Sequence, residues 1–263
     1  MKQQQTDYRL GAVSFLNTKP LIEGLAGEPG VQLELAVPAE LAGMLQAGCV
    51  DAALVPVIDI GRAGGRWKRI SDAGIGSNGD TLTVQVFSRV QPENMTTLHA
   101  DTHSHTSVIL AQLVWKGFHR RPLTVVPLKP ETGVKQCESV LLIGDKVVGA
   151  DVGSFQYRVD LGGAWRAWTG LPFVFAAWAA PVDRETSRLA QLLSQARDRG
   201  VARAAELAVE HGPALRWPVD LARDYLTRLM KYTITPAAEA GMNKFLELAR
   251  VEGLIPKPGV LVK

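Results

Sequence analysis

The sequence predicts an α/β protein made of two lobes with a substrate cleft between them. Strand-like and helix-like segments alternate in the first part of the chain, and the same alternation starts again near residue 97. Repeated steps of this kind are typical of parallel sheets covered by helices. From Arg184 onward the pattern is helical. Two such series followed by a helical tail favour two lobes over one large sheet.

Chain length and composition agree with this prediction. The chain has 263 residues, of which 46% are hydrophobic and 21% charged, which suits two globular lobes of ordinary size. The formal net charge is only +3, and Lys and Arg are spread along the chain. This distribution lacks the clustered basic face of a nucleic-acid-binding protein and slightly favours an anionic small molecule as ligand.

The cysteines and the N-terminal residues predict a reduced, cytoplasmic protein. Cys49 and Cys137 lie beside apolar runs, and we expect buried thiols there instead of a disulfide or a metal site. The residues before the first strand lack the apolar run of a signal peptide. No apolar stretch reaches the length of a membrane span, so no membrane association is expected.

The first lobe is predicted from three early β-α steps and two later strands. A strand at Tyr8 to Val13 precedes a helix, for which Thr18 is the expected N-cap and Pro20 suits the first turn. Pro38 opens a second helix, which Gly48 ends. The other expected strands are Val31 to Val37, Val50 to Val57, Trp67 to Ile75 and Leu82 to Val90.

The second lobe repeats this order after Pro92. A strand at Thr97 to Ala100 leads through a polar turn into a helix that carries apolar residues at helical spacing from Val108 to Phe118. Further strands are expected at Leu123 to Leu128 and Ser139 to Ile143, and the apolar segment Leu171 to Ala179 is expected to return the chain to the first lobe.

These elements predict how the chain is divided. We expect lobe 1 to comprise residues 1–90 and 181–263, with the helical C-terminal tail packed on it, and lobe 2 to comprise residues 91–180. A doubled β-α pattern with two crossovers and a helical tail is what a two-lobed hinge protein of the type II periplasmic-binding-protein architecture would give.

Polar residues gather in three turns at predicted strand ends. The turns are Ser14 to Thr18, Thr81 to Thr83 and Thr102 to Ser107. In open α/β sheets, ligands bind at the carboxyl ends of strands, and a helix N-terminus there attracts anions. We therefore expect the turns to converge on one cleft and hold the two ends of a dicarboxylate. The alternative is that Asn17 and the hydroxyl residues only cap helices.

Common catalytic motifs are missing from the sequence. It has no Gly-x-Ser-x-Gly elbow, dinucleotide fingerprint, P-loop or His-Glu-x-x-His motif. His103 and His105 alternate in one turn, but no carboxylate or Cys stands at ligand spacing, so metal binding is disfavoured. His105 suits a general base or an anion contact better. Asp145 is interpreted most simply as a helix cap, with a salt bridge or a substrate contact as alternatives.

Six stretches together resemble the chorismate dehydratase family, which opens the futalosine route to menaquinone. The resemblance runs in order from about residue 8 to residue 180, whereas the tail agrees only in general character. Its stretches are Gly11 to Leu21, Val50 to Val57, Val84 to Ser88, Asp101 to Ser107, Leu141 to Asp145, and Asp160 to Gly162 with Trp165, Trp168 and Thr169 to Ala176.

The resemblance implies a reaction and a set of site residues. Family members remove water from the dicarboxylate chorismate to give 3-[(1-carboxyvinyl)oxy]benzoate, with no redox or metal cofactor. Asn17 would orient the substrate and assist departure of the hydroxyl, and Thr83 stands where the family has Ser. Those two form the expected catalytic pair. The expected substrate-binding residues are Ser14, Thr18, Ser104, His105, Thr106, Ser107 and Asp145.

Two departures from the family pattern keep other functions open. The turn Ser77 to Thr81 replaces an Asp-Gly-Pro-Val-like turn, and His105 stands where the family usually has Arg. Arg binds a carboxylate through two hydrogen bonds and stays charged, whereas the charge of His depends on pH. The alternatives are an enzyme like 1,4-dihydroxy-6-naphthoate synthase, whose reaction is assisted by His, and a non-catalytic binding protein for a small cyclic carboxylate.

Overall fold

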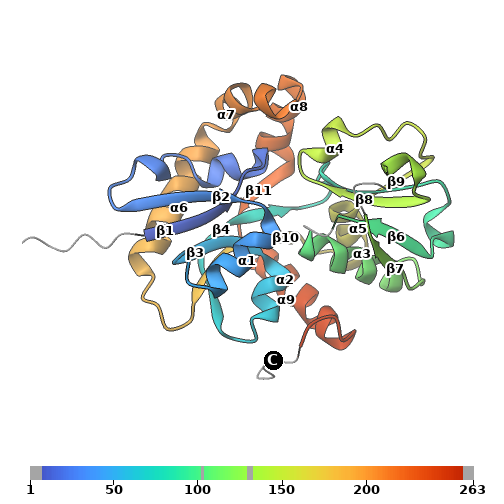
Figure 1. Ribbon diagram of the computed structural model, residues 1–263, viewed down its shortest axis with the longest axis horizontal. Coiled ribbons are helices and arrows are strands. Elements are labelled where there is room, and N and C mark those ends of the chain that lie inside the picture. Colours follow the sequence, from blue (N-terminus) through green and yellow to red (C-terminus); the bar gives the residue numbers. More distant parts are fainter. Residues whose placement is uncertain (1–7, 102–103, 129–132, 257–263) are drawn as a thin grey trace, which may run out of the picture.

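The computed structural model describes residues 8–101, 104–128 and 133–256. These residues form two lobes, each built on its own sheet, that lie side by side (Figure 1). Thr102 and His103 lie outside the described residues, so of the paired histidines in the sequence only His105 is described.

The first lobe is built on a six-stranded sheet of order β11-β4-β10-β3-β1-β2. Strands β1, β2 and β3 are parallel, whereas β10 runs antiparallel to β3 and β4, and β11 antiparallel to β4. The bounds are β1 (Tyr8–Val13), β2 (Val31–Ala36), β3 (Ala52–Pro56), β4 (Trp67–Ser77), β10 (Phe173–Pro181) and β11 (Met230–Thr233).

The second lobe is built on a five-stranded sheet of order β7-β6-β8-β5-β9. Here β6 pairs in parallel with β7 and β8, and β5 is antiparallel to β8 and β9. Its strands are β5 (Val84–Ser88), β6 (Thr97–Ala100), β7 (Thr124–Pro127), β8 (Ser139–Ile143) and β9 (Tyr157–Asp160).

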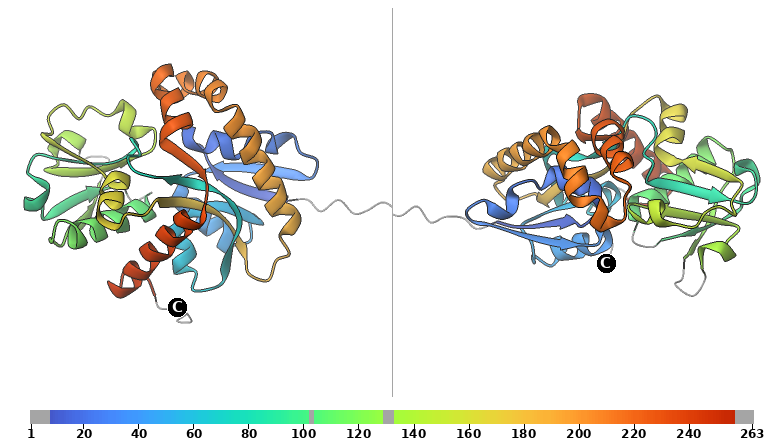
Figure 2. Two further views of the ribbon diagram at one scale, coloured as in Figure 1. Left: turned by 180° about the vertical axis from the view of Figure 1, so that it is seen from behind. Right: turned by 90° about the horizontal axis from the view of Figure 1, so that it is seen from above.

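Helices cover both sheets and join the lobes (Figure 2). The first lobe carries α1 (Pro38–Gln46), α2 (Val57–Arg62), α6 (Ser187–Ala202), α7 (Ala204–His211), α8 (Val219–Asp224) and α9 (Pro236–Val251), and the second carries α3 (His105–Gly117), α4 (Lys146–Gly149) and α5 (Leu161–Thr169). Helix α9 contacts β10 and α2 of the first lobe and α3 of the second. One apolar cluster accordingly continues across the lobes, from Trp165 in α5 to Phe245 in α9.

Most segments with a clear local pattern form the predicted element. The predicted strands Tyr8–Val13, Thr97–Ala100 and Ser139–Ile143 are confirmed with their bounds, and α9 follows the predicted helix Pro236 to Val251. The helix expected after the first strand is instead a short 3₁₀ helix, η1 (Leu16–Leu21), which contains Thr18. The predicted cap at Thr18 is therefore wrong, because the helix begins two residues earlier.

Sheet membership differs from the lobe boundaries expected at residues 90 and 180. Strand β5 belongs to the second sheet, where it pairs with β8 and β9, and β10 belongs to the first, between β3 and β4. The chain thus leaves the first sheet in the turn at residues 78–83. Local patterns indicate that a segment is a strand, but pairing with distant segments decides to which sheet it belongs.

The tail and the cysteines bring two further corrections. The helix expected at Leu221 to Met230 ends as a π-helical turn, η6 (Tyr225–Leu229), and Met230 already starts β11. Cys137 is buried as expected, but Cys49 is exposed, because it follows α1 in a turn at the surface.

Within the described residues, no helix combines the length and apolar character that crossing a membrane requires.

Candidate active site

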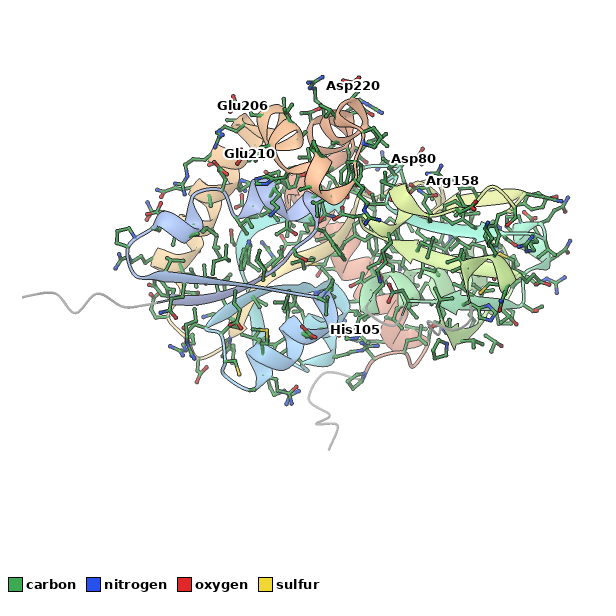
Figure 3. The ribbon with its side chains drawn as sticks, turned by 45° about the horizontal axis from the view of Figure 1, so that its top comes forward. Asp80, His105, Arg158, Glu206, Glu210 and Asp220 are labelled. Atoms are coloured by element: carbon green, nitrogen blue, oxygen red, sulfur yellow. The ribbon has the colours of Figure 1, made fainter. Side chains whose placement is uncertain are left out.

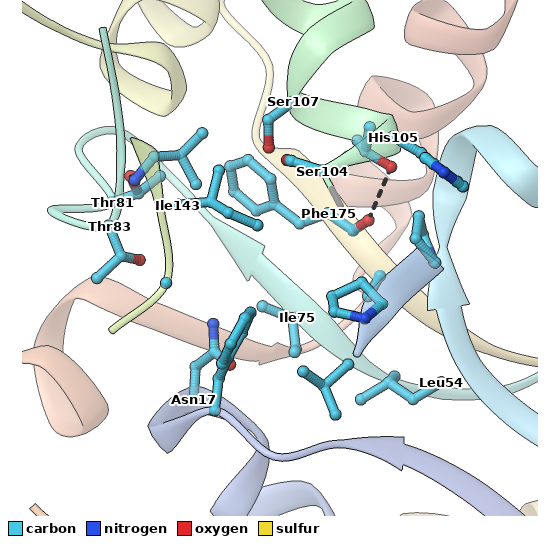
Figure 4. Close-up of a pocket in the computed structure, with 18 of the residues that line it drawn as sticks. Asn17, Leu54, Ile75, Thr81, Thr83, Ser104, His105, Ser107, Ile143 and Phe175 are labelled. Carbon is cyan, nitrogen blue, oxygen red and sulfur yellow. Dashed lines mark hydrogen bonds between the residues drawn. The ribbon is translucent and has the colours of Figure 1, made fainter. Parts of the chain in front are cut away.

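A cavity lies between the two lobes (Figure 4). Its atom-free space of about 640 Å³ includes open solvent at its mouth. Phe175, Ile75 and Leu54 supply part of its apolar wall. The polar residues that line it are Asn17, Thr81, Thr83, Ser104, His105, Thr106 and Ser107. Asn17 and Thr83 lie toward one side of the view, and Ser104, His105 and Ser107 lie opposite.

Asn17 enters the cavity from η1. Strand β1 ends at Val13, and the buried side chains of Leu16 and Leu21 fix the 3₁₀ turn that follows. Asn17 lies between these two residues and is only partly buried. Its Nδ2 donates a hydrogen bond of 3.0 Å to the phenol oxygen of Tyr225. The side-chain amide is therefore oriented by the C-terminal tail, more than 200 residues away in the chain.

Thr83 lies at the end of the turn that leaves the first sheet, and Asp160 fixes this turn. The Asp160 carboxylate accepts the backbone N–H groups of Thr81 and Leu82, each at 2.8 Å, and caps α5 through Gly162. Leu82 adopts a left-handed φ of 66°, a conformation that costs energy in a residue other than Gly. Burial raises the pKa of Asp160, while its hydrogen bonds act to lower it. The two backbone bonds hold the strained turn and so place Thr83.

Tyr225 joins Asn17 and Thr83. Its phenol oxygen lies 2.7 Å from the Thr83 hydroxyl and 3.0 Å from the Asn17 amide nitrogen. The side chain is 1% exposed, and its ring stacks on Trp217 with 4.7 Å between ring centroids. Burial raises the pKa of Tyr225, although its hydrogen bonds with Thr83 and Asn17 oppose the rise. The phenol is consequently protonated and neutral at physiological pH.

Asp145 lies behind this wall of the cavity and links the lobes. It follows β8 of the second lobe and accepts a 2.9 Å bond from Trp217 Nε1 and a longer one, 3.3 Å, from the Leu16 backbone N–H. Burial raises the pKa of Asp145, and the bonds from Trp217 and Leu16 oppose it. Gly144, not Asp145, lines the cavity. The cap interpretation fails because Asp145 makes no side-chain cap bond to α4.

The opposite wall is formed by the start of α3. Ser104 precedes the helix, and Ser104, His105, Thr106 and Ser107 all line the cavity. Because the first N–H groups of a helix have no acceptor within it, this end presents donors and a positive dipole end to an anion. The hydroxyls of Ser104 and Ser107 add polar groups in a buried setting.

Thr106 has a different use at this wall. Its hydroxyl donates 3.2 Å to the carbonyl of Phe175 in β10, drawn as a dashed line in Figure 4, and accepts 3.3 Å from the Ile58 N–H in α2. Both partners belong to the first lobe, so Thr106 attaches α3 to that lobe. Ser104 and Ser107 are therefore better suited than Thr106 to bind a ligand.

His105 forms a second pair across the lobes with Asp59 of α2. Its Nδ1 lies 2.7 Å from Asp59 Oδ2, and the other carboxylate oxygen of Asp59 pairs with Arg62 at 3.0 Å. Asp59 is buried, whereas the His105 side chain is 28% exposed. Figure 3 places His105 where α2 meets α3, away from the acidic side chains of α7 and α8. The carboxylate of Asp59 therefore orients the imidazole through Nδ1.

Six of the nine expected site residues line the cavity, namely Asn17, Thr83, Ser104, His105, Thr106 and Ser107. The other three do not. Ser14 is exposed, Thr18 is fully buried within η1, and Asp145 joins the lobes instead of facing the cavity. Because η1 starts at Leu16, Ser14 lies before it and Thr18 lies inside it.

Three residues that shape the site were not predicted from the sequence: Tyr225, Trp217 and Asp59. Tyr225 and Trp217 come from the tail, and Asp59 from a short helix directly after β3. Among the described residues that line the cavity, His105 is the only one with an ionisable side chain. An anion bound here would thus rely on N–H groups, hydroxyls and one imidazole.

Comparison with known proteins shows the family. A family model described as menaquinone biosynthesis matches residues 8–251. The chain belongs to this family. The resemblance found in the sequence is confirmed, and it extends through the tail that supplies Tyr225. A curated relative from Thermus thermophilus, named chorismate dehydratase, is 28% identical over 260 residues, covering 91% of this chain and 94% of the relative.

Solved structures share the fold at much lower identity. The periplasmic aliphatic sulphonate-binding protein from Escherichia coli is 10% identical, with a TM-score of 0.68 over 96% of this chain and 89% of its own. A Candida albicans protein described as having the generic periplasmic-binding-protein fold is 12% identical, with a TM-score of 0.54 over 98% of each chain. The predicted two-lobed binding-protein fold is confirmed.

Proposed function

We propose that this family member is an enzyme that dehydrates chorismate to 3-[(1-carboxyvinyl)oxy]benzoate. The observation that carries the proposal is the placement of Asn17 and Thr83, which share one hydrogen-bond partner, in the cavity between the lobes, opposite the start of α3. The relative named chorismate dehydratase, which aligns over 91% of the chain, supports the same activity. The enzyme would then be a carbon-oxygen hydro-lyase of the futalosine route, acting in the cytoplasm, where the sequence predicts the protein to be.

The reaction needs orientation more than reactive groups. A proton leaves the ring carbon that bears the enolpyruvyl ether, hydroxide leaves the neighbouring carbon, and the ring becomes aromatic. Aromatisation supplies the driving force, so the protein has to exclude water, hold the substrate and place donors where negative charge develops. A largely apolar cavity with amide and hydroxyl groups on its walls suits this task.

The two walls have separate roles in this proposal. The Asn17 amide and the Thr83 hydroxyl lie close enough to share one partner, Tyr225, and would act together on the departing hydroxyl. Ser104, Ser107 and the first N–H groups of α3 would bind a substrate carboxylate, with His105 beside them. Chorismate carries two carboxylates, one of which could accept the ring proton because no protein carboxylate lines the cavity among the described residues.

The His105–Asp59 pair favours one alternative. An imidazole held by a buried carboxylate is the usual arrangement of a histidine that moves protons, and it would suit a reaction like that of 1,4-dihydroxy-6-naphthoate synthase. The family assignment names the pathway and leaves the step open. A non-catalytic receptor remains the second alternative, since the same fold serves binding proteins.

One incubation separates these possibilities. Purified protein is mixed with chorismate, without added metal or nucleotide, and the products are followed by mass spectrometry. The proposal expects a product lighter by one water, formed at a rate proportional to enzyme concentration and absent with heat-denatured protein. Chorismate that stays intact but raises the melting temperature would indicate a receptor. If chorismate neither reacts nor shifts the melting temperature, it is excluded as the substrate.

A further inference from the structure

Tyr225 is the only residue among those described that hydrogen-bonds both proposed catalytic side chains. The Asn17 amide donates to it at 3.0 Å, and the Thr83 hydroxyl lies 2.7 Å from it. Asn17 belongs to the first lobe and Thr83 to the turn that enters the second. One phenol oxygen therefore connects the reactive groups of both lobes. The local sequence around Leu221 to Met230 does not predict this contact.

The hydrogen bonds around Tyr225 have a defined direction. A phenol has one proton to donate, and here its oxygen already accepts from Asn17. A buried hydroxyl without an acceptor is costly, so the phenol proton is directed to the Thr83 oxygen, its other partner. Thr83 then accepts from Tyr225, and its own proton is left for a partner on the cavity side, where Thr83 lines the wall.

We propose that Tyr225 is a positioning residue that makes Thr83 a hydrogen-bond donor toward the substrate while it fixes the orientation of the Asn17 amide. The inference rests on the proposed function and adds to it which group donates each hydrogen bond. The Thr83 hydroxyl would donate to the oxygen that leaves chorismate as hydroxide, where negative charge develops. Without Tyr225, Thr83 could instead donate to Asn17 or rotate away, and the donor would be lost from the reacting oxygen.

The surroundings of Tyr225 hold it in this role. Its ring stacks on Trp217 with an interplanar angle of 22°, and Trp217 donates in turn to Asp145 of the second lobe. The residue begins the π-helical turn η6, a type of distortion often found at functional sites. Asp145 also accepts the N–H of Leu16, directly before Asn17. The network thus closes on itself and ties the orientation of Asn17 to contact between the lobes.

A pair of tyrosine substitutions tests the proposal with a matched control. Tyr225→Phe keeps the stacked ring and removes only the hydroxyl. Tyr232→Phe makes the same change at another buried tyrosine in the same part of the tail, whose hydroxyl has no hydrogen-bond partner among the described residues. We expect Tyr225→Phe to lower kcat by about 10–100-fold with KM changed less than about threefold, since misplaced groups cost rate more than binding. Tyr232→Phe should leave both constants unchanged.

A second measurement separates positioning from a general structural effect. Thr83→Val removes the hydroxyl through which Tyr225 is proposed to act. If the proposal holds, adding Tyr225→Phe to Thr83→Val lowers kcat far less than it does in the wild-type protein. Equal losses in both backgrounds, or a Tyr225→Phe protein with wild-type kcat, would overturn it.

A third measurement does not depend on turnover. The urea midpoint of unfolding is measured for Tyr225→Phe in the wild-type protein and in a protein that carries both Asn17→Ala and Thr83→Val. The network predicts a clear drop in the first case and a much smaller one in the second, because the partners are then already gone. Equal drops would overturn the inference. If the wild-type protein leaves chorismate intact, the proposed function fails while this cycle still decides whether the network exists.

Discussion

The two polar walls of the cavity are built on different principles. On one wall, Asn17 and Thr83 are uncharged and are held by Tyr225, whose raised pKa keeps it neutral. On the other, His105 pairs with the carboxylate of Asp59 at the start of α3. In the sequence, both walls resemble one another as polar turns that follow strands.

The first wall fixes the positions of neutral groups, whereas the second carries the ionisable side chain of the cavity. A wall of neutral groups, fixed by buried hydrogen bonds, has the same shape over a wide pH range and suits the chemical step. A wall that contains an imidazole beside a helix N-terminus offers N–H donors and the positive end of a helix dipole, and it suits recognition of an anion. We therefore expect substitutions on the first wall to act mainly on kcat, and substitutions on the second mainly on KM.

The largest effect is expected on the first wall, from Asn17→Ala. Removing one donor at a site of developing negative charge typically costs about 10²–10³-fold in kcat, and we expect a loss of that size here with KM little changed. Ser14→Ala is the matched control, since Ser14 lies in the same turn but is exposed and does not line the cavity. Steady-state kinetics and a melting curve on both variants make the comparison; a folded Asn17→Ala protein with full turnover contradicts the assignment.

A smaller effect is expected on the second wall, from His105→Gln. The variant keeps a polar side chain of similar reach but removes the imidazole, so we expect KM to rise by about tenfold, the size of one hydrogen bond to a charged group, and kcat to fall less. Asp59→Asn should move KM in the same direction, because Asp59 orients the ring.

A matched histidine substitution outside the cavity sharpens this test and should leave KM and kcat unchanged. His211→Gln, at the end of α7 outside the cavity, is the control. A kcat that falls more than KM rises would instead give His105 a chemical role and favour the alternative of a His-assisted reaction.

The smallest effect concerns the contact between the lobes and is seen in stability. Because burial raises the folded-state pKa of Asp145, the folded protein favours the protonated carboxyl, and ionisation costs stability as the pH rises through that pKa. Asp145→Asn cannot ionise. The melting temperature of the variant minus that of the wild type should therefore become more positive, by about 1–3 °C, between about pH 4 and pH 7. A difference that stays constant or becomes more negative would show that the bonds from Trp217 and Leu16 outweigh burial.

Local patterns in the sequence predicted the elements better than their assembly. Strand β1 and helix α9 were predictable because alternation at Tyr8 to Val13 and helical spacing after Pro236 are properties of a few neighbouring residues. The sheet to which β5 belongs was not, since its partners β8 and β9 lie more than 50 residues further along the chain. The short elements α2, β9 and α5 were also missed.

The candidate site was predictable only where its residues follow strands. Asn17 and Ser104 to Ser107 stand at strand ends, which is where sheets of this type bind ligands. Tyr225 and Trp217 stand in an amphipathic segment where an aromatic residue usually indicates core packing, and only the folded chain brings them to Asn17 and Asp145. The sequence does not distinguish Asp59 from any other acidic residue in a first helical turn, because its bond to His105 forms only in the folded chain.

The most direct test of the two-wall account is a crystal structure of the Asn17→Ala protein with chorismate bound. We predict that chorismate occupies the cavity between the lobes, with its ring hydroxyl beside Thr83 and a carboxylate within hydrogen-bond distance of Ser104 or Ser107. The account is contradicted if the ligand is reversed in the cavity, with a carboxylate on Thr83. It is contradicted equally if chorismate lies in the second cavity, beside β11, which Met230, Tyr232 and Thr235 line.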